Sequence, residues 1–289
     1  MTVEMPFRQG SPGQVRAPRL SEDVTTPCDL IVDEHARSGA VNMAFDAALL
    51  QIFSNAPGCV VRVYRWSQPT VTVGYFQDPV SCRDVLPGSL PVVRRLTGGG
   101  AILHDRELTY SCVVPVRHPL HSDPVRLYAR IHGAIVQLLQ DCGLPCRLRS
   151  ADPDSPSVPR GLPVTGLALP SGLPSSAQPF LCFLRQDPND IVCTSGEPQA
   201  LTRKIAGSAQ RRRRGTVLQH GSILLRTAGL TPQLPGIVEL CPGFNEESFV
   251  AALPEQIASV LSLSVRQRHY SAEEKNLAEV LCNVAGNIG

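Results

Sequence analysis

The sequence predicts an α/β (α+β) fold, in which helices flank a mixed β-sheet within one main domain. Several short runs rich in Val, Ile, Thr and Tyr are bounded by Pro, Gly or Asp, as is typical of strands, and four longer segments have apolar residues at helical spacing. The chain has 289 residues, of which 43% are hydrophobic, and this is enough for a large core.

The helices are predicted from signals at their ends as well as from their periodicity. The clearest one begins after Asp123, which can cap it, has Pro124 in its first turn and stops at Gly143. An earlier helix has Ser38 available as its N-cap. Besides the helix after Asp123, helices are expected over residues 38–55, 245–261 and 271–284.

The strands are predicted from β-branched and aromatic residues, which fit the pleated, half-buried surface of a sheet. A turn is expected to join the strands at 190–193 and 204–209. The full set of expected strands covers residues 59–66, 70–74, 90–95, 109–114, 190–193, 204–209 and 217–225.

Composition divides the chain unevenly. Residues 1–27 are rich in Pro, Arg, Ser and Thr without periodicity, and we expect a flexible leader there. The main domain is expected over 28–245, with a Pro-rich insertion at 150–181 that cannot continue a helix or a central strand. Residues 246–289 are expected to form a C-terminal helical closure.

Charge and composition disfavour several classes of protein. The 27 basic and 25 acidic residues nearly balance, which argues against a nucleic-acid binder, and no apolar run approaches the length of a membrane span. The N-terminus has no apolar segment of the kind found in signal peptides, so we expect a cytoplasmic protein. The ten cysteines contain no C-x-x-C pair and no clustered zinc set, so no metal site is expected, and most are expected to be buried.

A glycine-rich segment, RRLTGGGAILHD at residues 94–105, is the most informative part of the sequence. Gly98–Gly100 would let a ligand or another chain segment approach the backbone closely, and their N–H groups can face an oxygen atom. Arg95 beside them is a forked donor for an anionic or amide group. Taken alone, the segment fits a glycine-rich hairpin turn at least as well as it fits a ligand-binding loop.

A second segment, RKIAGSAQ at residues 203–210, places Lys204 within a strand of small and apolar residues. Such a lysine either extends to the surface or points into a pocket, where it neutralises a developing negative charge. Taken alone, this segment favours a lysine that extends to the surface.

Together, these segments resemble the biotin/lipoate protein ligase superfamily and, within it, the lipoate–protein ligase A-like branch. Further matching blocks stand in the same order, and the resemblance covers roughly residues 29–226 apart from the Pro-rich insertion. The chain departs from the family pattern at Thr202, where the family has Gly before the Arg-Lys pair. The matching blocks lie at residues 42–50, 64–77, 94–111, 190–192, 203–210 and 218–225.

The resemblance implies the catalytic-domain fold of that superfamily and a site for a medium-chain acyl group. It implies that Lys204 contacts the acyl carbonyl region. In a thiolate mechanism, backbone N–H groups around Gly207–Ala209 could hold the oxyanion. His104 and His220 are expected to line the site without acting as acid or base. The full set of expected substrate-binding residues is Arg95, Thr97, Gly98, Gly99, Gly100, Ala101, Ile102, Leu103, His104, Gly207, Ser208, Ala209 and His220.

Cys182 distinguishes between the activities of the family. The pair Cys182-Phe183 resembles the Cys-Phe pair of the cysteine-dependent octanoyltransferases of lipoate biosynthesis. A thiolate can take an acyl group from a thioester at almost no thermodynamic cost, and Lys204 nearby would favour the thiolate by its opposite charge. Cys182 and Lys204 are therefore the expected catalytic residues. The alternative for Cys182 is a buried core cysteine.

The expected function is that of an octanoyl-[acyl-carrier-protein]:protein N-octanoyltransferase in protein lipoylation. Its expected partners are acyl carrier protein as donor and a lipoyl domain or glycine-cleavage H-type protein as acceptor, without nucleic acid, membrane or cofactor. The run Arg211–Arg214 is expected to be a solvated loop, or else a contact for an acidic carrier. Three alternatives stay open: an ATP- and magnesium-dependent lipoate–protein ligase, an amidotransferase between carrier proteins, and a non-catalytic protein that binds acyl carriers.

Overall fold

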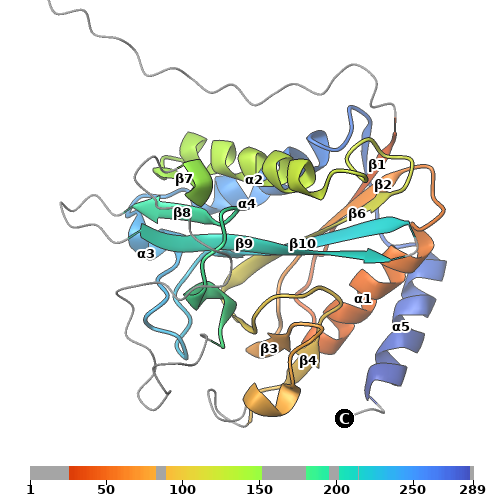
Figure 1. Cartoon of the computed structure of the whole chain (residues 1–289), viewed down its shortest axis with the longest axis horizontal. Helices are drawn as coiled ribbons and strands as arrows, with labels where there is room; N and C mark the ends of the chain where they lie inside the picture. Colours follow the sequence, from red (N-terminus) through yellow and green to blue (C-terminus); the bar gives the residue numbers. More distant parts are fainter. Residues whose placement is uncertain (1–25, 83–88, 152–179, 195–201, 214, 287–289) are drawn as a thin grey trace, which may run out of the picture.

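The computed structural model describes residues 26–82, 89–151, 180–194, 202–213 and 215–286 (Figure 1). Nearly all of the leader expected at 1–27 and most of the Pro-rich insertion expected at 150–181 lie outside the described residues. The same holds for residues 195–201, which connect two of the expected strands.

The described chain forms both helices and strands, and several strands follow one another directly, as β4, β5 and β6 do. The helices are α1 (Gly39–Ile52), α2 (Pro124–Asp141), α3 (Ile237–Leu240), α4 (Glu246–Ser259) and α5 (Ala272–Gly286), with 3-10 turns η1 (Pro79–Cys82), η2 (Arg149–Ala151) and η3 (Cys182–Leu184). The strands are β1 (Cys28–Val32), β2 (Cys59–Tyr64), β3 (Thr70–Val73), β4 (Val92–Arg94), β5 (Ile102–His104), β6 (Glu107–Pro115), β7 (Cys146–Leu148), β8 (Ile191–Thr194), β9 (Thr202–Arg213), β10 (Thr216–Leu224) and β11 (Val265–Gln267).

Two sheets organise the molecule. The large sheet has the strand order β11-β1-β2-β6-β10-β9-β8-β7, and the small one has the order β4-β3-β5. The large sheet is mixed, because β1 pairs in parallel with β2 and β11 while the other pairs are antiparallel. Strand β11 lies between α4 and α5 in the chain, so the segment after residue 246 contributes an edge strand as well as helices.

Helices cover both faces of the large sheet (Figure 1). Helices α2 and α4 pack together on one face, where Ile135 and Phe249 belong to the main core. Helices α1 and α5 pack on the other face, where Phe45 and Ala278 belong to a second core. The expected fold, a mixed sheet flanked by helices, is confirmed.

The predicted helix ends are confirmed where the sequence carried specific signals. The Asp123 carboxylate accepts a hydrogen bond from the Arg126 backbone N–H, Pro124 opens α2, and Gly143 takes a left-handed φ of 91° just after it. The Ser38 hydroxyl accepts a hydrogen bond from the Val41 N–H at the start of α1.

Several predicted strands had wrong bounds, and four strands were missed. The strand expected at 90–95 is only Val92–Arg94, whereas the one expected at 204–209 runs on to Arg213. The missed strands are β1, β5, β7 and β11. Arg211–Arg213 is therefore part of a strand and not a loop: β10 pairs with these residues, from Leu218↔Arg211 to Thr216↔Arg213, while the side chains of Arg212 and Arg213 are exposed.

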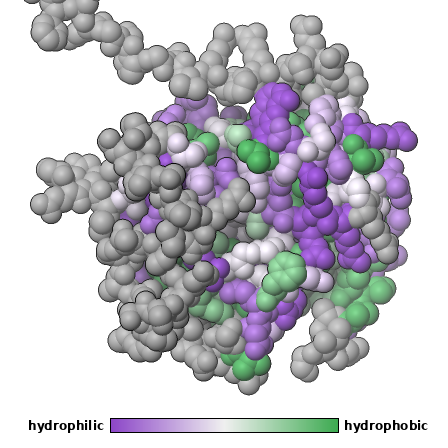
Figure 2. Space-filling view, viewed as in Figure 1, coloured by the Kyte–Doolittle hydropathy of each residue, from purple (hydrophilic) through white to green (hydrophobic). Residues whose placement is uncertain are grey.

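The surface carries no extended apolar face in the view of Figure 2. Hydrophilic side chains cover most of the described part of this face, and hydrophobic ones form small separate groups. Among the described residues, no helix has the length and apolar character needed to cross a bilayer.

Candidate active site

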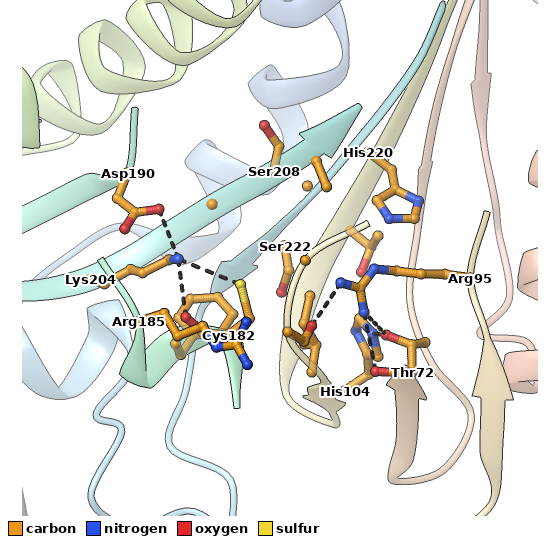
Figure 3. A pocket seen from close by; sticks show the side chains of 18 of the residues that line it. Thr72, Arg95, His104, Cys182, Arg185, Asp190, Lys204, Ser208, His220 and Ser222 are labelled. Carbon is orange, nitrogen blue, oxygen red and sulfur yellow. Dashed lines mark hydrogen bonds and ion pairs between the residues drawn. The ribbon is translucent and has the colours of Figure 1, made fainter. Parts of the chain in front are cut away.

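A cavity of about 180 Å³ lies where β9 and β10 of the large sheet meet the small sheet and η3 (Figure 3). Its wall includes the aromatic rings of Tyr64, Trp66 and Phe183. Cys182 and Lys204 lie at one end, and Arg95 and His104 lie across the cavity from them (Figure 3). The predicted residues that line it are Arg95, Gly99, Gly100, Ile102, His104, Cys182, Lys204, Gly207, Ser208, Ala209 and His220.

The glycine-rich segment places Cys182 at the cavity. The Cys182 N–H donates to the Ala101 carbonyl at 2.7 Å, and the Ala101 N–H donates to the Phe180 carbonyl at 3.0 Å. This short parallel bridge joins two segments that are far apart in the chain. Cys182 itself is half-buried, so its sulfur is sheltered but still borders the cavity.

Lys204 lies between Cys182 and a carboxylate. Its Nζ is 3.7 Å from the Cys182 Sγ, 3.3 Å from the Cys182 carbonyl oxygen and 2.8 Å from Oδ1 of Asp190 (Figure 3). Burial alone would lower the pKa of Lys204, but Asp190 and Cys182 outweigh it and hold this pKa above its usual value. The side chain is therefore an ammonium group beside the sulfur.

Asp190 is a site residue whose role the sequence did not predict. It immediately precedes β8, its other oxygen accepts a hydrogen bond from the Asp187 N–H at 2.8 Å, and its side chain is buried. A buried ammonium group needs a paired anion, and Asp190 supplies it. The signal in the sequence was the combination of an aspartate before one strand and a lysine within its expected neighbour.

Both terminal nitrogens of Arg95 are hydrogen-bonded within the protein, whereas its buried Nε has no partner among the described residues. Its Nη1 donates to the Thr72 carbonyl and hydroxyl at 3.2 Å, and its Nη2 donates to the carbonyls of Gly98 and Gly100 at 2.6 and 2.7 Å. Burial lowers the pKa of Arg95 to about 10. The guanidinium thus fixes the glycine-rich loop around the cavity; Arg95 also lines the cavity, and its expected contact with substrate stays a prediction.

An aromatic and polar cluster forms the far end of the cavity. The Trp66 ring stacks on the His104 ring with centroids 3.8 Å apart, and the Trp66 Nε1 donates to the Thr109 hydroxyl at 2.8 Å. His104 is held between the Glu107 carboxylate at 2.5 Å and the Thr72 hydroxyl at 2.7 Å. The sequence identified His104 in this group but not the role of Trp66, which forms part of the wall.

His220 lines the cavity from β10 and contacts two buried side chains. Its Nε2 is 2.6 Å from the Thr97 hydroxyl, and its Nδ1 is 3.6 Å from the Asp46 carboxylate. Burial lowers the pKa of His220 although Asp46 opposes this shift. The imidazole is therefore held in the wall by its neighbours, as expected for a residue that lines the site.

Four of the expected substrate-binding residues do not line the cavity. Thr97 lies behind His220, and Gly98 contributes a carbonyl to Arg95. Ala101 and Leu103 belong to a small core beneath the cavity. Leu103 points away because side chains alternate along β5, so that Ile102 and His104 face the cavity instead.

A candidate metal centre is absent from the part of the chain that the structure describes, where no three His, Cys, Asp or Glu side chains gather as ligands. Among the nine cysteines whose burial the structure describes, four are only partly buried: Cys142, Cys182, Cys241 and Cys282. The other five are buried: Cys28, Cys59, Cys112, Cys146 and Cys193.

Comparison with families of known proteins matches residues 38–267 to the lipoyl protein ligase A/B catalytic domain. Among curated proteins, octanoyltransferase LipM of Macrococcus caseolyticus is 34% identical over 204 residues, which are 68% of this chain and 65% of that protein. Octanoyltransferase LipM of Bacillus subtilis is 35% identical over 199 residues, which are 67% of this chain and 64% of that protein. The chain thus spans slightly less than two thirds of the length of these relatives.

Solved structures show the same fold. A lipoate-protein ligase A bound with ATP superimposes with a TM-score of 0.61 at 22% identity, covering 90% of this chain and 94% of that one. A bi-partite lipoate protein ligase from Thermoplasma acidophilum, studied with its E2 lipoyl domain, gives a TM-score of 0.60 at 20% identity and covers 90% and 92%. At this level of identity the likeness concerns the fold alone.

Proposed function

This chain belongs to the lipoyl protein ligase A/B catalytic domain family, and we propose that it is an octanoyl-[acyl-carrier-protein]:protein N-octanoyltransferase acting through a thioester on Cys182. The observation that carries the proposal is the Lys204 ammonium group, 3.7 Å from the Cys182 sulfur and anchored by Asp190. An ammonium group so close to the sulfur can stabilise the negative charge that the sulfur carries during acyl transfer. The similarity to octanoyltransferase LipM of Macrococcus caseolyticus and of Bacillus subtilis also supports it.

In the first step, the Cys182 thiolate attacks the carbonyl carbon of the octanoyl thioester on the donor. The bond from that carbon to the donor's sulfur then breaks, and the donor leaves as a thiol that has gained the proton lost by Cys182. Lys204 balances the negative charge on whichever sulfur carries it. The backbone around Gly207–Ala209 borders the same space, because the β8–β9 ladder stops at the Ile191–Ala206 pair, and we assign the oxyanion to those of its N–H groups that face away from β10.

In the second step, the side-chain nitrogen of an acceptor lysine attacks the carbonyl carbon of the acyl group on Cys182. A carbon–nitrogen bond forms, the carbon–sulfur bond breaks, and the nitrogen loses a proton. The Cys182 thiolate is regenerated beside Lys204. Because an amide is far more stable than a thioester, the second step makes the overall transfer essentially irreversible.

The partners of this reaction are an acyl carrier protein as donor and a lipoyl domain or glycine-cleavage H-type protein as acceptor. The basic residues at the end of β9, Arg211–Arg213, suit an acidic carrier, since opposite charge speeds association. The reaction as written needs no cofactor. The cytoplasmic location expected from the sequence stays a prediction.

The decisive experiment is intact-protein mass spectrometry after mixing the protein with octanoyl-acyl carrier protein in the absence of ATP. We expect an octanoyl adduct that hydroxylamine removes, and we expect Cys182→Ser to abolish it. Cys282→Ser is the matched control, because Cys282 lies on α5 outside the cavity, and it should keep the adduct. Lipoyl-adenylate formation with ATP, and no adduct without it, would instead assign the chain to the ATP- and magnesium-dependent ligases.

A further inference from the structure

The loop that follows β3 carries an exposed aromatic pair, Tyr75 and Phe76. Phe76 is 89% exposed, and the ring of Tyr75, which is 40% exposed, meets the Phe76 ring at 86° with centroids 5.1 Å apart. Two further apolar side chains are exposed on neighbouring elements, Val80 on η1 and Val92 on β4, which pairs with β3 (Figure 1). A single exposed apolar side chain is ordinary, but a group of them in one region marks a surface that a partner covers.

Hydrogen bonds hold this loop in place in the free protein. The Nη1 of Arg94 donates to the carbonyls of Tyr75 and Gln77, both at 2.7 Å. The Gly74 N–H donates to the Gln77 Oε1 at 3.0 Å, and the Gln77 N–H donates back to the Gly74 carbonyl at 2.9 Å. The Phe76 ring is therefore presented to solvent on an ordered backbone, and a partner that binds it does not have to order the loop first.

Two contacts place the loop beside the cavity. Gly74 lies against the glycine-rich loop so closely that a Cβ atom there would be 2.2 Å from the carbonyl oxygen of Gly99, which lines the cavity. In addition, the Arg211 guanidinium lies over the Tyr75 ring, 3.8 Å from its centroid. Ala209, which lines the cavity, is two residues before Arg211 and faces the same side of β9. The aromatic pair therefore lies at the edge of the cavity.

The charged side chains around the aromatic pair are mainly basic. Arg94 and Arg211 contact the loop directly, and Arg213 lies on the same face of β9 as Arg211 with its side chain exposed. The loop also carries an acid, Asp78, whose carboxylate accepts a hydrogen bond from the Val80 N–H at 3.0 Å. Three guanidinium groups against one carboxylate leave a net positive charge, and such a surface attracts an acidic partner.

The position of this surface favours the donor of the acyl group over the acceptor. Arg211 is seven residues after Lys204 on β9, about 23 Å along an extended strand, and Lys204 lies beside Cys182. An acceptor lysine has a stem of only four carbons, so its domain must bind directly over Cys182. An acyl carrier protein holds its acyl thioester at the end of a long flexible arm, which can reach Cys182 while the body of the carrier rests at a distance.

We propose that the aromatic pair and the three arginines form the docking surface for an acidic acyl carrier protein that donates the octanoyl group, with the Phe76 ring as the apolar anchor. A few aromatic and arginine side chains often supply most of the binding energy of an interface. This inference rests on the proposed function and adds the place where the donor binds. It predicts an effect on the first step of the reaction and none on the second.

The test compares a protein-bound donor with a small one. Acylation of Cys182 is followed by intact-protein mass spectrometry with octanoyl-acyl carrier protein and, separately, with octanoyl-pantetheine, a thioester that carries no protein. We expect Phe76→Ser to lower the second-order rate constant for the carrier at least tenfold and to leave the rate with octanoyl-pantetheine unchanged. Transfer from isolated acyl-enzyme to a lipoyl domain should also be unchanged. Val280→Ser is the matched control, because Val280 is 57% exposed on α5, outside the cavity, and it should change none of these rates.

The charge of the surface is tested with a second pair of variants. Arg213→Gln removes one positive charge from the surface, and we expect it to slow acylation by the carrier at least threefold at low salt and to weaken the dependence of that rate on salt. Arg266→Gln removes one positive charge on β11, the strand at the other edge of the large sheet, and should change neither. Phe76 and Arg213 are both exposed, so neither substitution is expected to disturb the fold.

The outcomes separate this inference from the function on which it rests. A wild-type protein that forms no adduct with either donor would remove the proposed function and this inference with it. Acylation of the wild type by octanoyl-pantetheine but not by the carrier would keep Cys182 as the nucleophile and overturn the docking surface. The surface is also overturned if Phe76→Ser slows acylation by both donors equally, slows only the transfer to the lipoyl domain, or changes no rate.

Discussion

A Cβ atom on Gly207 would lie 2.7 Å from Cε of Lys204, closer than such atoms approach in proteins. It would also lie 3.2 Å from the Oδ1 of Asp190. The missing side chain at Gly207 is therefore what allows the lysine and the aspartate to meet beside the Cys182 sulfur. The glycine is required for space and not for an unusual backbone conformation.

Gly207→Ala should displace the Lys204 ammonium from the Cys182 sulfur. We expect the rate of acyl-enzyme formation to fall at least tenfold, while the fold persists because only the end of one side chain has to move. Gly133→Ala in α2 is the matched control: nothing lies within 4 Å of a Cβ there, and alanine favours a helix over glycine by about 1 kcal/mol. Equal acylation rates in both variants would contradict the role given to Gly207.

Asp190→Asn should leave the Lys204 ammonium buried without its counter-charge. Removing one partner of a buried ion pair costs about 3–5 kcal/mol, so we expect a loss of that order in the free energy of unfolding measured in urea. Glu246→Gln breaks the exposed pair with Arg226 and should cost about 1 kcal/mol or less. Similar losses in the two variants would show that Asp190 does not hold a buried charge.

Arg95→Lys should loosen the glycine-rich loop. A lysine cannot reproduce the fork that binds the carbonyls of Thr72, Gly98 and Gly100, and a hydrogen bond to a charged group is worth about 1.5–3 kcal/mol. We expect lower stability and faster amide hydrogen exchange over residues 97–101. Arg94→Lys is the control, because Arg94 bonds the exposed loop at Tyr75 and Gln77 and should leave that exchange unchanged.

The fold could be predicted where local chemistry decides it. Helix α2 carried its own start and stop signals in Asp123, Pro124 and Gly143, and it was predicted with its ends. Strand β11 has only three residues and exists because its neighbour β1 offers a free edge, so no local pattern marks it. The extension of β9 through three arginines was missed because it depends on pairing with β10, which no local pattern marks; the side chains of Arg212 and Arg213 stay exposed.

The site could be predicted only where its residues lie in segments that resemble a known family. Cys182 and Lys204 were identified because the segments around them resemble a family, and the cavity brings them together. His132, which is hydrogen-bonded to the cavity-lining Ser208, carried no such signal: it lies among apolar positions of α2, and this partner is 76 residues away. Arg95 was identified as a site residue. Its hydrogen bonds to backbone carbonyls were not predicted, because they depend on how the loop folds.

The buried His132 should make the stability of the protein depend on pH. Its pKa is about 4 in the folded protein and 6.5 in an exposed histidine, so the unfolded chain binds more protons between these values. The stabilisation is therefore complete above pH 6.5 and is lost as the pH falls towards 4; between pH 7.5 and 5.0 the loss amounts to about 2 kcal/mol. Urea unfolding at these two pH values should show that His132→Gln loses about 2 kcal/mol less than the wild type. Since His118 and His220 also have pKa values lowered by burial, the variant should keep a residual loss; an equal loss in both proteins would mean that His132 titrates normally.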